Sequence, residues 1–207
     1  MHRSGTSMVA KVLEKAGIFM GVIKDHNYEA MHFLSLNQQT LWAASANWLE
    51  PVVPDPKFWK TIPRDSLFAE HFKFSGRLQK LKYKLKNPAW GWKDPRNTFT
   101  LPMWLQLFPN AKVLHITRNC EEVANSLTKR NHVKGEVHDP RLEDLNFNRE
   151  LWHKYITQGQ SYAAELGHRY FEIDYQEITS RNPEAISKME KFCGVKLQVL
   201  FAYYVKS

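Results

Sequence analysis

A short apolar run followed directly by helix-starting residues limits this chain to a small set of folds. Residues 111–118, AKVLHITR, form the clearest strand candidate, and a helical pattern follows to about Arg130. Asn119 is a favourable N-cap for that helix, and the two glutamates after it suit its first turn. A second strand candidate, RYFEIDY at 169–175, follows a long helical stretch. Strands that alternate with helices predict a mainly parallel sheet with helices on both faces.

The rest of the chain has the pattern of one such α/β domain. Its 207 residues suit a single domain with a sizeable core, so we treat residues 1–207 as one unit. A short aromatic strand is expected within AWGWKDPRN, before a turn at Asp94-Pro95. Helices are predicted over 6–16, 29–49, 73–86, 101–108 and 142–166, with a last one between Asn182 and Gly194. Because ligands bind at the carboxyl ends of parallel strands, residues just after strands are the candidate ligand contacts.

Composition narrows the choice of partner. The formal net charge of +8 favours an anionic partner, such as a phosphorylated cofactor, an acidic glycan, nucleic acid or a membrane surface. No helix-turn-helix, zinc-finger or RRM signature is present, so we expect no nucleic acid partner. Cys120 and Cys193 are too few for a disulfide framework and lie in no metal-binding pattern. No membrane anchor or signal peptide is visible in this sequence, and a cytoplasmic location is expected.

The opening residues, MHRSGTSMVAKVL, have the pattern of a turn between a strand and a helix. Arg3, Ser4, Gly5, Thr6 and Ser7 surround the helix start, where unpaired backbone N–H groups and the helix dipole attract anions. Arg3 adds a charged, forked donor, and Gly5 lets the backbone approach a ligand closely. The stretch lacks the first glycine and the lysine of a Walker A motif. Taken alone, it is explained equally well as an ordinary capped helix.

A second anion site is predicted in HITRNCEEVANSLTKR. Arg118 ends the strand, Ser126 follows eight residues later, and Arg130 lies one helical turn beyond Ser126 on the same face. Two guanidinium groups and a hydroxyl near one strand end suit a terminal phosphate. A solvated helix face would explain Arg130 alone, but it does not explain the three residues together with the first loop.

These motifs resemble those of the sulfotransferases that use 3′-phosphoadenosine-5′-phosphosulfate (PAPS). In that family the first loop, RSGTS at 3–7 here, grips the 5′-phosphosulfate, and an arginine and a serine matching Arg118 and Ser126 grip the 3′-phosphate. The extra Arg130 is similar to the protein-tyrosine sulfotransferase branch and to many bacterial relatives. The resemblance implies a P-loop-like three-layer fold. It also implies PAPS as co-substrate, adenosine 3′,5′-bisphosphate as product, and no metal.

Two shorter segments extend the resemblance. WKDP is similar to a family segment whose lysine, Lys93 here, reaches the transferring sulfuryl group. FEIDYQEI is similar to a segment whose tyrosine, Tyr175 here, lies by the adenine. A surface lysine and a half-buried tyrosine are the plain alternatives. Many cytosolic relatives carry lysine where Arg3 stands, and a C-terminal KGxxGxW-type segment that this chain lacks, so the resemblance is to a shorter, more divergent branch.

Sulfuryl transfer builds negative charge on the bridging oxygen, so Arg3 and Lys93 are the predicted electrostatic catalysts. Arg3 cannot act as an acid, because guanidinium does not lose its proton in proteins, whereas Lys93 either acts through its charge or shares a proton with the leaving oxygen. The attacking hydroxyl also needs a base. The resemblance implies a glutamate or a histidine from KDHNYEAMHF. Glu29 is the first choice, because the segment resembles NPxGxFE of bacterial relatives, and the alternatives are His26, Asp25 and His32.

The acceptor is expected to be a hydroxyl or an amine, with a carbohydrate or small metabolite favoured. Five tryptophans, most of them expected to be structural, are candidate walls for it: Trp42, Trp48, Trp59, Trp90 and Trp92. The basic helix at 73–86 would face an acidic acceptor or solvent. An ATP-dependent P-loop kinase is the alternative enzyme, with Asp174 as the only candidate metal ligand after a strand. A catalytically inactive nucleotide- or anion-binding relative is the non-enzymatic alternative.

Sulfotransferases place a buried parallel strand before the first loop, and no such strand precedes Met1 in this sequence. We therefore expect Met1 to be an internal residue of a longer natural protein, with the first strand of the sheet missing. The two strands that flank a missing central strand are then expected to face an apolar gap.

Overall fold

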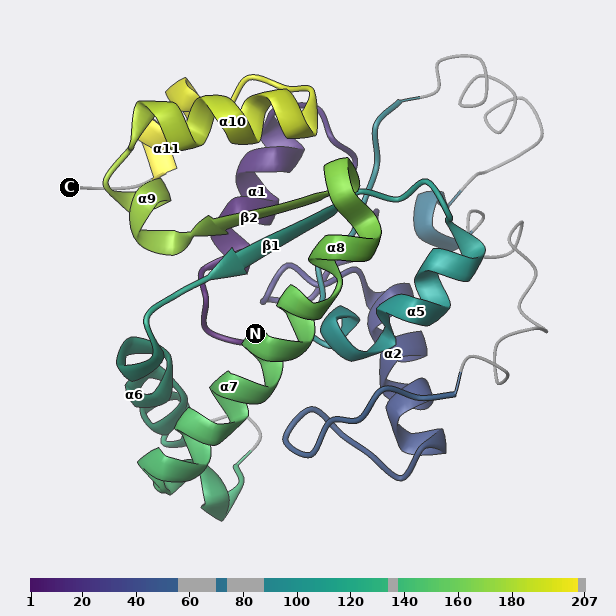
Figure 1. Ribbon diagram of the computed structural model, residues 1–207, viewed down its shortest axis with the longest axis vertical. Helices are drawn as coiled ribbons and strands as arrows, with labels where there is room; N and C mark the ends of the chain where they lie inside the picture. The colour runs from purple at the N-terminus through teal and green to yellow at the C-terminus, as the bar shows by residue number, and fades with distance from the viewer. Residues whose placement is uncertain (56–69, 74–87, 134–137, 205–207) are drawn as a thin grey trace.

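Two parallel strands form the centre of the fold. The computed structural model describes four stretches of the chain, residues 1–55, 70–73, 88–133 and 138–204 (Figure 1). Strand β1 (Val113–Thr117) pairs with β2 (Tyr170–Asp174), so that Thr117 lies opposite Asp174. Both predicted strands are confirmed. They pair directly in parallel, so the expected gap does not lie between them.

Helices account for most of the remaining described residues. They are α1 (Thr6–Lys15), α2 (Met31–Ala43), α5 (Asn97–Leu107), α6 (Cys120–Asn131), α7 (Leu145–Ser161), α8 (Ala163–Leu166), α9 (Tyr175–Thr179), α10 (Pro183–Cys193) and α11 (Gln198–Tyr204). Short 3-10 turns occupy Pro140–Glu143 and Gly167–Arg169. None of the helices in the described stretches is both long and apolar enough to cross a membrane.

Helices cover both faces of the strand pair, which confirms the predicted three-layer α/β architecture. On one face Ile116 and Ile173 pack into a core with residues of α1, α10 and α11. On the other face Val113 and Tyr170 pack against Leu101 of α5 and the apolar residues at the junction of α7 and α8. Figure 1 shows the same layers, with α1 behind the strands and α7 and α8 in front of them. The apolar residues of the strands alternate between the two cores, as the pleat requires.

Local capping explains where the helices begin and end. The Asn119 side chain accepts hydrogen bonds from the N–H groups of Glu121 and Glu122 and so starts α6 as predicted. Asn182 caps α10 in the same way, and Gly194 closes it in the left-handed conformation at φ 74°.

Several predicted boundaries are wrong. Helix α2 covers only part of 29–49, because Ser45 takes a left-handed backbone with φ 54° just beyond it. The stretch 142–166 divides into a 3-10 turn, α7 and α8, and α11 follows the helix expected to be last. The expected aromatic strand is reduced to a single parallel bridge between Phe19 and Trp90. Nearly all of the basic helix predicted over 73–86 lies outside the described residues.

Helix α5 begins four residues earlier than predicted, so Pro102 lies inside it and not in its first turn. A proline there cannot donate to the carbonyl oxygen of Thr98, four residues before it. The hydroxyl of Tyr162 donates to that oxygen at 3.1 Å instead. A tertiary contact therefore satisfies the group that the sequence leaves open.

Candidate anion-binding site

A cleft of about 210 Å³ opens between the first loop, the start of α6 and the segment before α5. The N-terminal segment passes below the strands before it enters α1 (Figure 1). Eleven described residues line the cleft: His2, Arg3, Gly5, Thr6, Ser7, Asn27, Glu29, Lys93, Pro95, Arg118 and Arg130. Among these described side chains four are cationic and one is a carboxylate, so the cleft attracts anions.

The first loop enters α1 through two residues with left-handed backbones. Arg3 has φ 65°, and Gly5, the N-cap of α1, has φ 80°. A Cβ on Gly5 would lie 2.1 Å from a ring carbon of Tyr175, so only glycine fits there. Thr6 and Ser7 follow in the first turn of α1, where backbone N–H groups point out of the helix end. The Ser7 hydroxyl itself donates to the Asn27 carbonyl oxygen at 2.6 Å.

Ser4 is the one residue of the RSGTS loop that turns away from the cleft. It is fully buried, and its hydroxyl has no hydrogen-bond partner among the described residues. Its predicted contact with a cofactor is not visible in this arrangement, because Ser4 is buried and is not among the described residues that line the cleft.

The two predicted anion motifs meet at the cleft. Arg3 Nε donates to Ser126 Oγ at 2.9 Å, and Arg118 Nη1 donates to the Arg3 carbonyl oxygen at 3.1 Å. Arg118 also pairs with Glu122 at 2.7 Å. Arg130 lines the cleft one turn beyond Ser126, and its guanidinium lies 5.6 Å from the centre of the Trp48 ring. The spacing of residues 118, 126 and 130 therefore gathers these groups beside the first loop.

Tyr175 connects the same two motifs without lining the cleft. It is the first residue of α9, which the Asp174 side chain caps together with Glu177. Its ring lies 4.7 Å from the Arg118 guanidinium and packs closely against Gly5. The ring therefore fixes the guanidinium of the second motif relative to the glycine of the first.

Lys93 and Glu29 form an ion pair on the opposite wall. Lys93 Nζ lies 3.0 Å from Glu29 Oε1, and Arg96 Nη1 lies 3.1 Å from Glu29 Oε2. The same Arg96 nitrogen lies 2.9 Å from Asp94 Oδ1. Burial raises the pKa of the Asp94 carboxyl to about 6, although the Arg96 charge opposes this. Each Glu29 oxygen thus has its own cationic partner.

A buried polar network supports this wall from behind. Asn37, on α2, donates to Asp94 Oδ2 at 2.9 Å and to Asn97 Oδ1 at 2.8 Å. Its own oxygen accepts from the Thr100 hydroxyl at 2.6 Å and from the Trp104 indole at 2.8 Å. Buried amides retain such networks because an unpaired polar group in the core is costly.

The other candidate bases lie away from the cleft. His26 is exposed, and its Nε2 contacts the Asn27 side chain at 3.0 Å. Asp25 accepts the backbone N–H of Glu29 at 2.7 Å, and His32 lies in the first turn of α2 beside Phe33. Of the four candidates, Glu29 is the one found among the described cleft-lining residues.

Sequence reasoning missed His2, which lines the cleft next to Arg3. Its ring centre lies 4.8 Å from that of Trp48, and its Nε2 is buried with no described partner. Burial lowers the pKa of His2 well below its ordinary value, and the nearby Arg96 and Arg130 charges lower it further. The imidazole is therefore neutral. In the sequence, the position of His2 next to the first loop is the one signal that could have marked it as a cleft residue.

Arg96, Asn37 and Asn27 were also missed. Arg96 stands three residues after Lys93, but its pairing with Glu29 joins positions 67 residues apart. Asn37 lies in a segment without a recognisable motif, and Asn27 lies in KDHNYEAMHF, which was considered only for its candidate bases. A long-range contact of this kind leaves no local pattern to read.

The tryptophans are mainly structural, as expected. Trp90 and Trp92 pack against the core formed by Phe33, Met103 and Trp104, and Trp48 packs beside Leu41 and Tyr155. Trp42 is mostly exposed on α2, and Trp59 lies outside the described residues. Within the described stretches, no three histidine, cysteine, aspartate or glutamate side chains gather as a metal site would require.

Comparisons with known proteins identify the family of the chain. An alignment over 125 residues, which covers 56% of the chain, gives 32% identity to an uncharacterised protein of Aquifex aeolicus (strain VF5). The chain matches only 15% of the length of that relative. No solved structure matches the chain at a significant level. A family model described as the sulfotransferase family matches residues 1–198. Since that match covers nearly the whole chain, the chain belongs to the sulfotransferase family.

Proposed function

We propose that this chain binds PAPS and transfers its sulfuryl group to a hydroxyl or an amine of an acceptor. Family membership supports sulfuryl transfer in general. The observation that carries the proposal is the cleft in which the first loop meets the second motif, lined by Arg3, Lys93, Arg118 and Arg130. Fixed cations and helix N–H groups at one place are the donor set that a phosphosulfate and a phosphate need.

The size of the cleft suggests which part of the nucleotide it takes. Its volume of about 210 Å³ is below the roughly 300 Å³ of pockets that enclose a whole small ligand. We therefore assign the cleft to the anionic groups and place the adenosine along its rim, beside Arg118 and Tyr175. In this assignment Tyr175 would contact the adenine and would also hold the Arg118 guanidinium in place.

The residues divide into two sets. Arg3, with Gly5 and the N–H groups of Thr6 and Ser7, would hold the 5′-phosphosulfate. Arg118, Ser126 and Arg130 would hold the 3′-phosphate. The hydrogen bond between Arg3 and Ser126 joins the sets, and a bound phosphate would compete for both of its partners. Ser4 supports the loop from the buried side.

When bound, PAPS supplies an electrophilic sulfuryl group on a good leaving group. Lys93 and Arg3 would then stabilise the negative charge on the bridging oxygen, which is the largest contribution expected from fixed groups in such a site. Arg3 acts only through its charge, because its guanidinium stays protonated. The charged Lys93 ammonium carries three hydrogens and no lone pair. It would therefore donate a hydrogen bond to the same oxygen.

Glu29 is the proposed base. Its carboxylate lines the cleft, and each oxygen keeps a lone pair beyond its contact with Lys93 or Arg96. An acceptor hydroxyl entering the cleft would give its proton to one of these oxygens. Exchange of Glu29→Gln should lower turnover by about 100-fold or more, whereas the His26→Gln control should leave it within about twofold. The opposite ranking would assign the base to His26.

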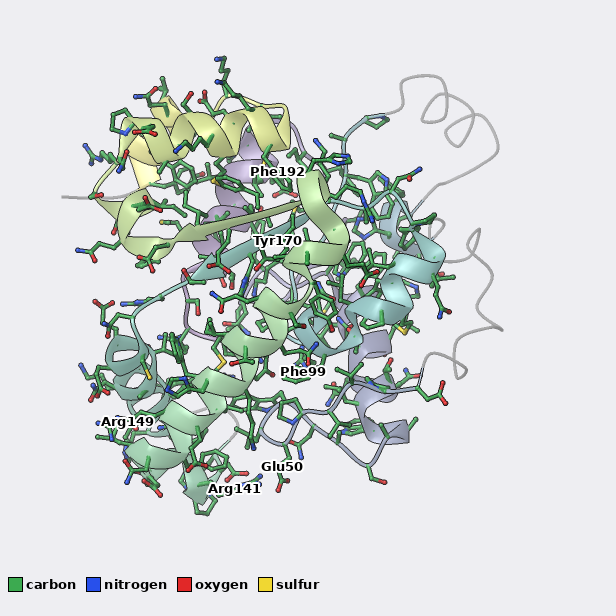
Figure 2. The ribbon with its side chains drawn as sticks, viewed as in Figure 1. Glu50, Phe99, Arg141, Arg149, Tyr170 and Phe192 are labelled. Atoms are coloured by element: carbon green, nitrogen blue, oxygen red, sulfur yellow. The ribbon has the colours of Figure 1, made fainter. Side chains whose placement is uncertain are left out.

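Calorimetry with adenosine 3′,5′-bisphosphate tests the nucleotide assignment. Arg118→Ala removes a charge-assisted donor of about 1.5–3 kcal/mol, so the affinity should fall by roughly 10- to 100-fold. Arg149→Ala is the matched control, because Arg149 is an exposed arginine on α7 that pairs with Glu121 outside the cleft (Figure 2). Absence of binding to the wild type, or an equal effect of both exchanges, would refute the assignment.

Turnover with PAPS and a panel of sugars, phenols and small alcohols then separates an enzyme from an inactive relative. We favour a carbohydrate or small hydroxylated metabolite as acceptor. Lys93→Ala should abolish measurable turnover, while nucleotide binding weakens but stays measurable. Binding of magnesium-ATP more tightly than adenosine 3′,5′-bisphosphate would favour a kinase instead.

A further inference from the structure

Arg96 is absent from the described residues that line the cleft, yet it contacts a residue that does. We propose that Arg96 is a positioning residue: it neutralises the Glu29 carboxylate and so keeps the Lys93 ammonium available to the bound anion. This inference rests on the proposed anion site and adds a residue that acts on it from behind.

The geometry divides the Glu29 charge between two cations. Lys93 Nζ lies 3.0 Å from Oε1, and Arg96 Nη1 lies 3.1 Å from Oε2. If Arg96 were neutral, the whole charge of Glu29 would be opposed by Lys93 alone. The ammonium would then be held more strongly by the carboxylate, and it would attract a ligand less.

The position of Arg96 is itself fixed. Its backbone N–H and its Nη1 both contact Asp94 Oδ1 at 2.9 Å, and Asn37 holds the other Asp94 oxygen. The guanidinium therefore has little freedom to leave Glu29. A positioning residue needs this rigidity, because a mobile partner would not hold a carboxylate in one place.

The charges of the cluster balance as they stand. Two cations, Lys93 and Arg96, face two carboxylates, Glu29 and Asp94. All four side chains are largely buried, so their interactions are screened less than those of surface groups. Loss of the Arg96 charge leaves a net negative cluster on the wall of an anion-binding cleft.

Calorimetry with two probes, adenosine 3′,5′-bisphosphate and pyrophosphate, tests the proposal. Arg96→Gln should weaken binding of both by roughly tenfold, although Arg96 is not expected to touch them. Arg96→Lys keeps the charge and should restore affinity to within about threefold of the wild type. Arg141→Gln is the matched control, because Arg141 also lies between two carboxylates but is remote from the cleft, and it should change affinity by less than about twofold.

A double variant separates charge compensation from a merely structural role. If Arg96 acts through Glu29, then Arg96→Gln should matter little when Glu29→Gln is already present. The double variant should then bind within about threefold of the Glu29→Gln single variant. A purely structural role predicts that the double variant binds roughly tenfold or more weakly than Glu29→Gln, and this result would overturn the proposal.

Circular dichroism shows whether Arg96→Gln folds. If it does not, the double variant still tests the proposal, because it removes one charge of each sign and so leaves the net charge of the cluster unchanged. Failure of the wild type to bind either probe would refute the proposed function and this inference together. Loss of binding in Arg118→Ala with unchanged binding in Arg96→Gln would leave the proposed function intact and overturn this inference alone.

Discussion

The tripeptide Asp-Pro-Arg occurs twice in this chain, at 94–96 on the wall of the cleft and at 139–141 before α7. Both copies fold into the same turn. In each the arginine N–H donates to the aspartate Oδ1, at 2.9 Å and 3.0 Å, and the guanidinium returns to the same carboxylate. Each arginine also reaches a second, distant carboxylate, Glu29 in one copy and Glu50 in the other.

The two copies differ in their surroundings. Asp94 is 0% and Arg96 13% exposed in their side chains, and Glu29 is 3% exposed. In the second copy Arg141 is 38% and Glu50 63% exposed, at the lower edge of the molecule in Figure 2. Local sequence therefore makes the turn, whereas burial decides whether its charges act on a site or merely on solvent.

Removal of the aspartate should separate the two copies most clearly. Asp94→Ala leaves Arg96 buried with one partner fewer and should lower the free energy of unfolding by about 3–5 kcal/mol. Asp139→Ala removes the cap of a short turn and a surface ion pair, so it should cost about 1 kcal/mol. Urea denaturation of both variants gives the comparison, and equal losses would show that burial does not distinguish them.

Asn37 is the next point at which the copies diverge. Asn37→Ala removes buried hydrogen bonds to Asp94, Thr100 and Trp104, so it should lower the free energy of unfolding by about 3 kcal/mol. Asn131 accepts the backbone N–H of Asp139 in the second copy. Asn131→Ala is the matched control, expected at about 1 kcal/mol in the same denaturation experiment. A smaller effect for Asn37 would mean that water replaces its hydrogen bonds.

The two aspartates should respond to pH in opposite directions. The pKa of Asp94 rises from 3.8 to about 6 through burial, so its contribution to stability is present below pH 4 and is lost as the pH rises through about 6. The hydrogen bonds of Arg141 lower the pKa of Asp139, so its contribution is present above its ordinary pKa and is lost as the pH falls.

Denaturation of the wild type, Asp94→Asn and Asp139→Asn between pH 3 and 7 measures these slopes by difference. The advantage of the wild type over Asp94→Asn should shrink with rising pH by at most about 3 kcal/mol. Its advantage over Asp139→Asn should grow over the lower part of the range. If both differences in the free energy of unfolding changed with pH in the same direction, burial would not explain the raised pKa of Asp94.

Added salt should change the stability of these variants least of all. Arg141→Gln should lower the free energy of unfolding by less than about 1 kcal/mol, and this loss should vanish in about 1 M salt, which screens exposed pairs. The effect of Asp94→Ala should persist in the same salt, because its partners are buried. Salt sensitivity at both copies would place Asp94 in contact with solvent.

The same comparison shows why parts of the site were predictable. The residues of the second motif were found because an arginine at a strand end and two positions on one helix face meet by local geometry alone. The first loop was found because a glycine at a helix start has a distinctive pattern. Arg96 was missed because its tripeptide looks the same in a buried and in an exposed copy. Glu29 could be placed before His26 only by resemblance, because burial of a side chain depends on segments far along the chain.

Local sequence was enough to predict the alternation of strands and helices, the caps of α6 and α10, and the two motifs that meet at the cleft, because each depends on residues within one or two helical turns. The tertiary fold was needed for the direct pairing of β1 with β2 and for the contact of Arg3 with Ser126. The same holds for the enclosure of Glu29 between Lys93 and Arg96. These contacts join segments about 60 to 120 residues apart, and their strength depends on the exclusion of water, which no short stretch of sequence specifies.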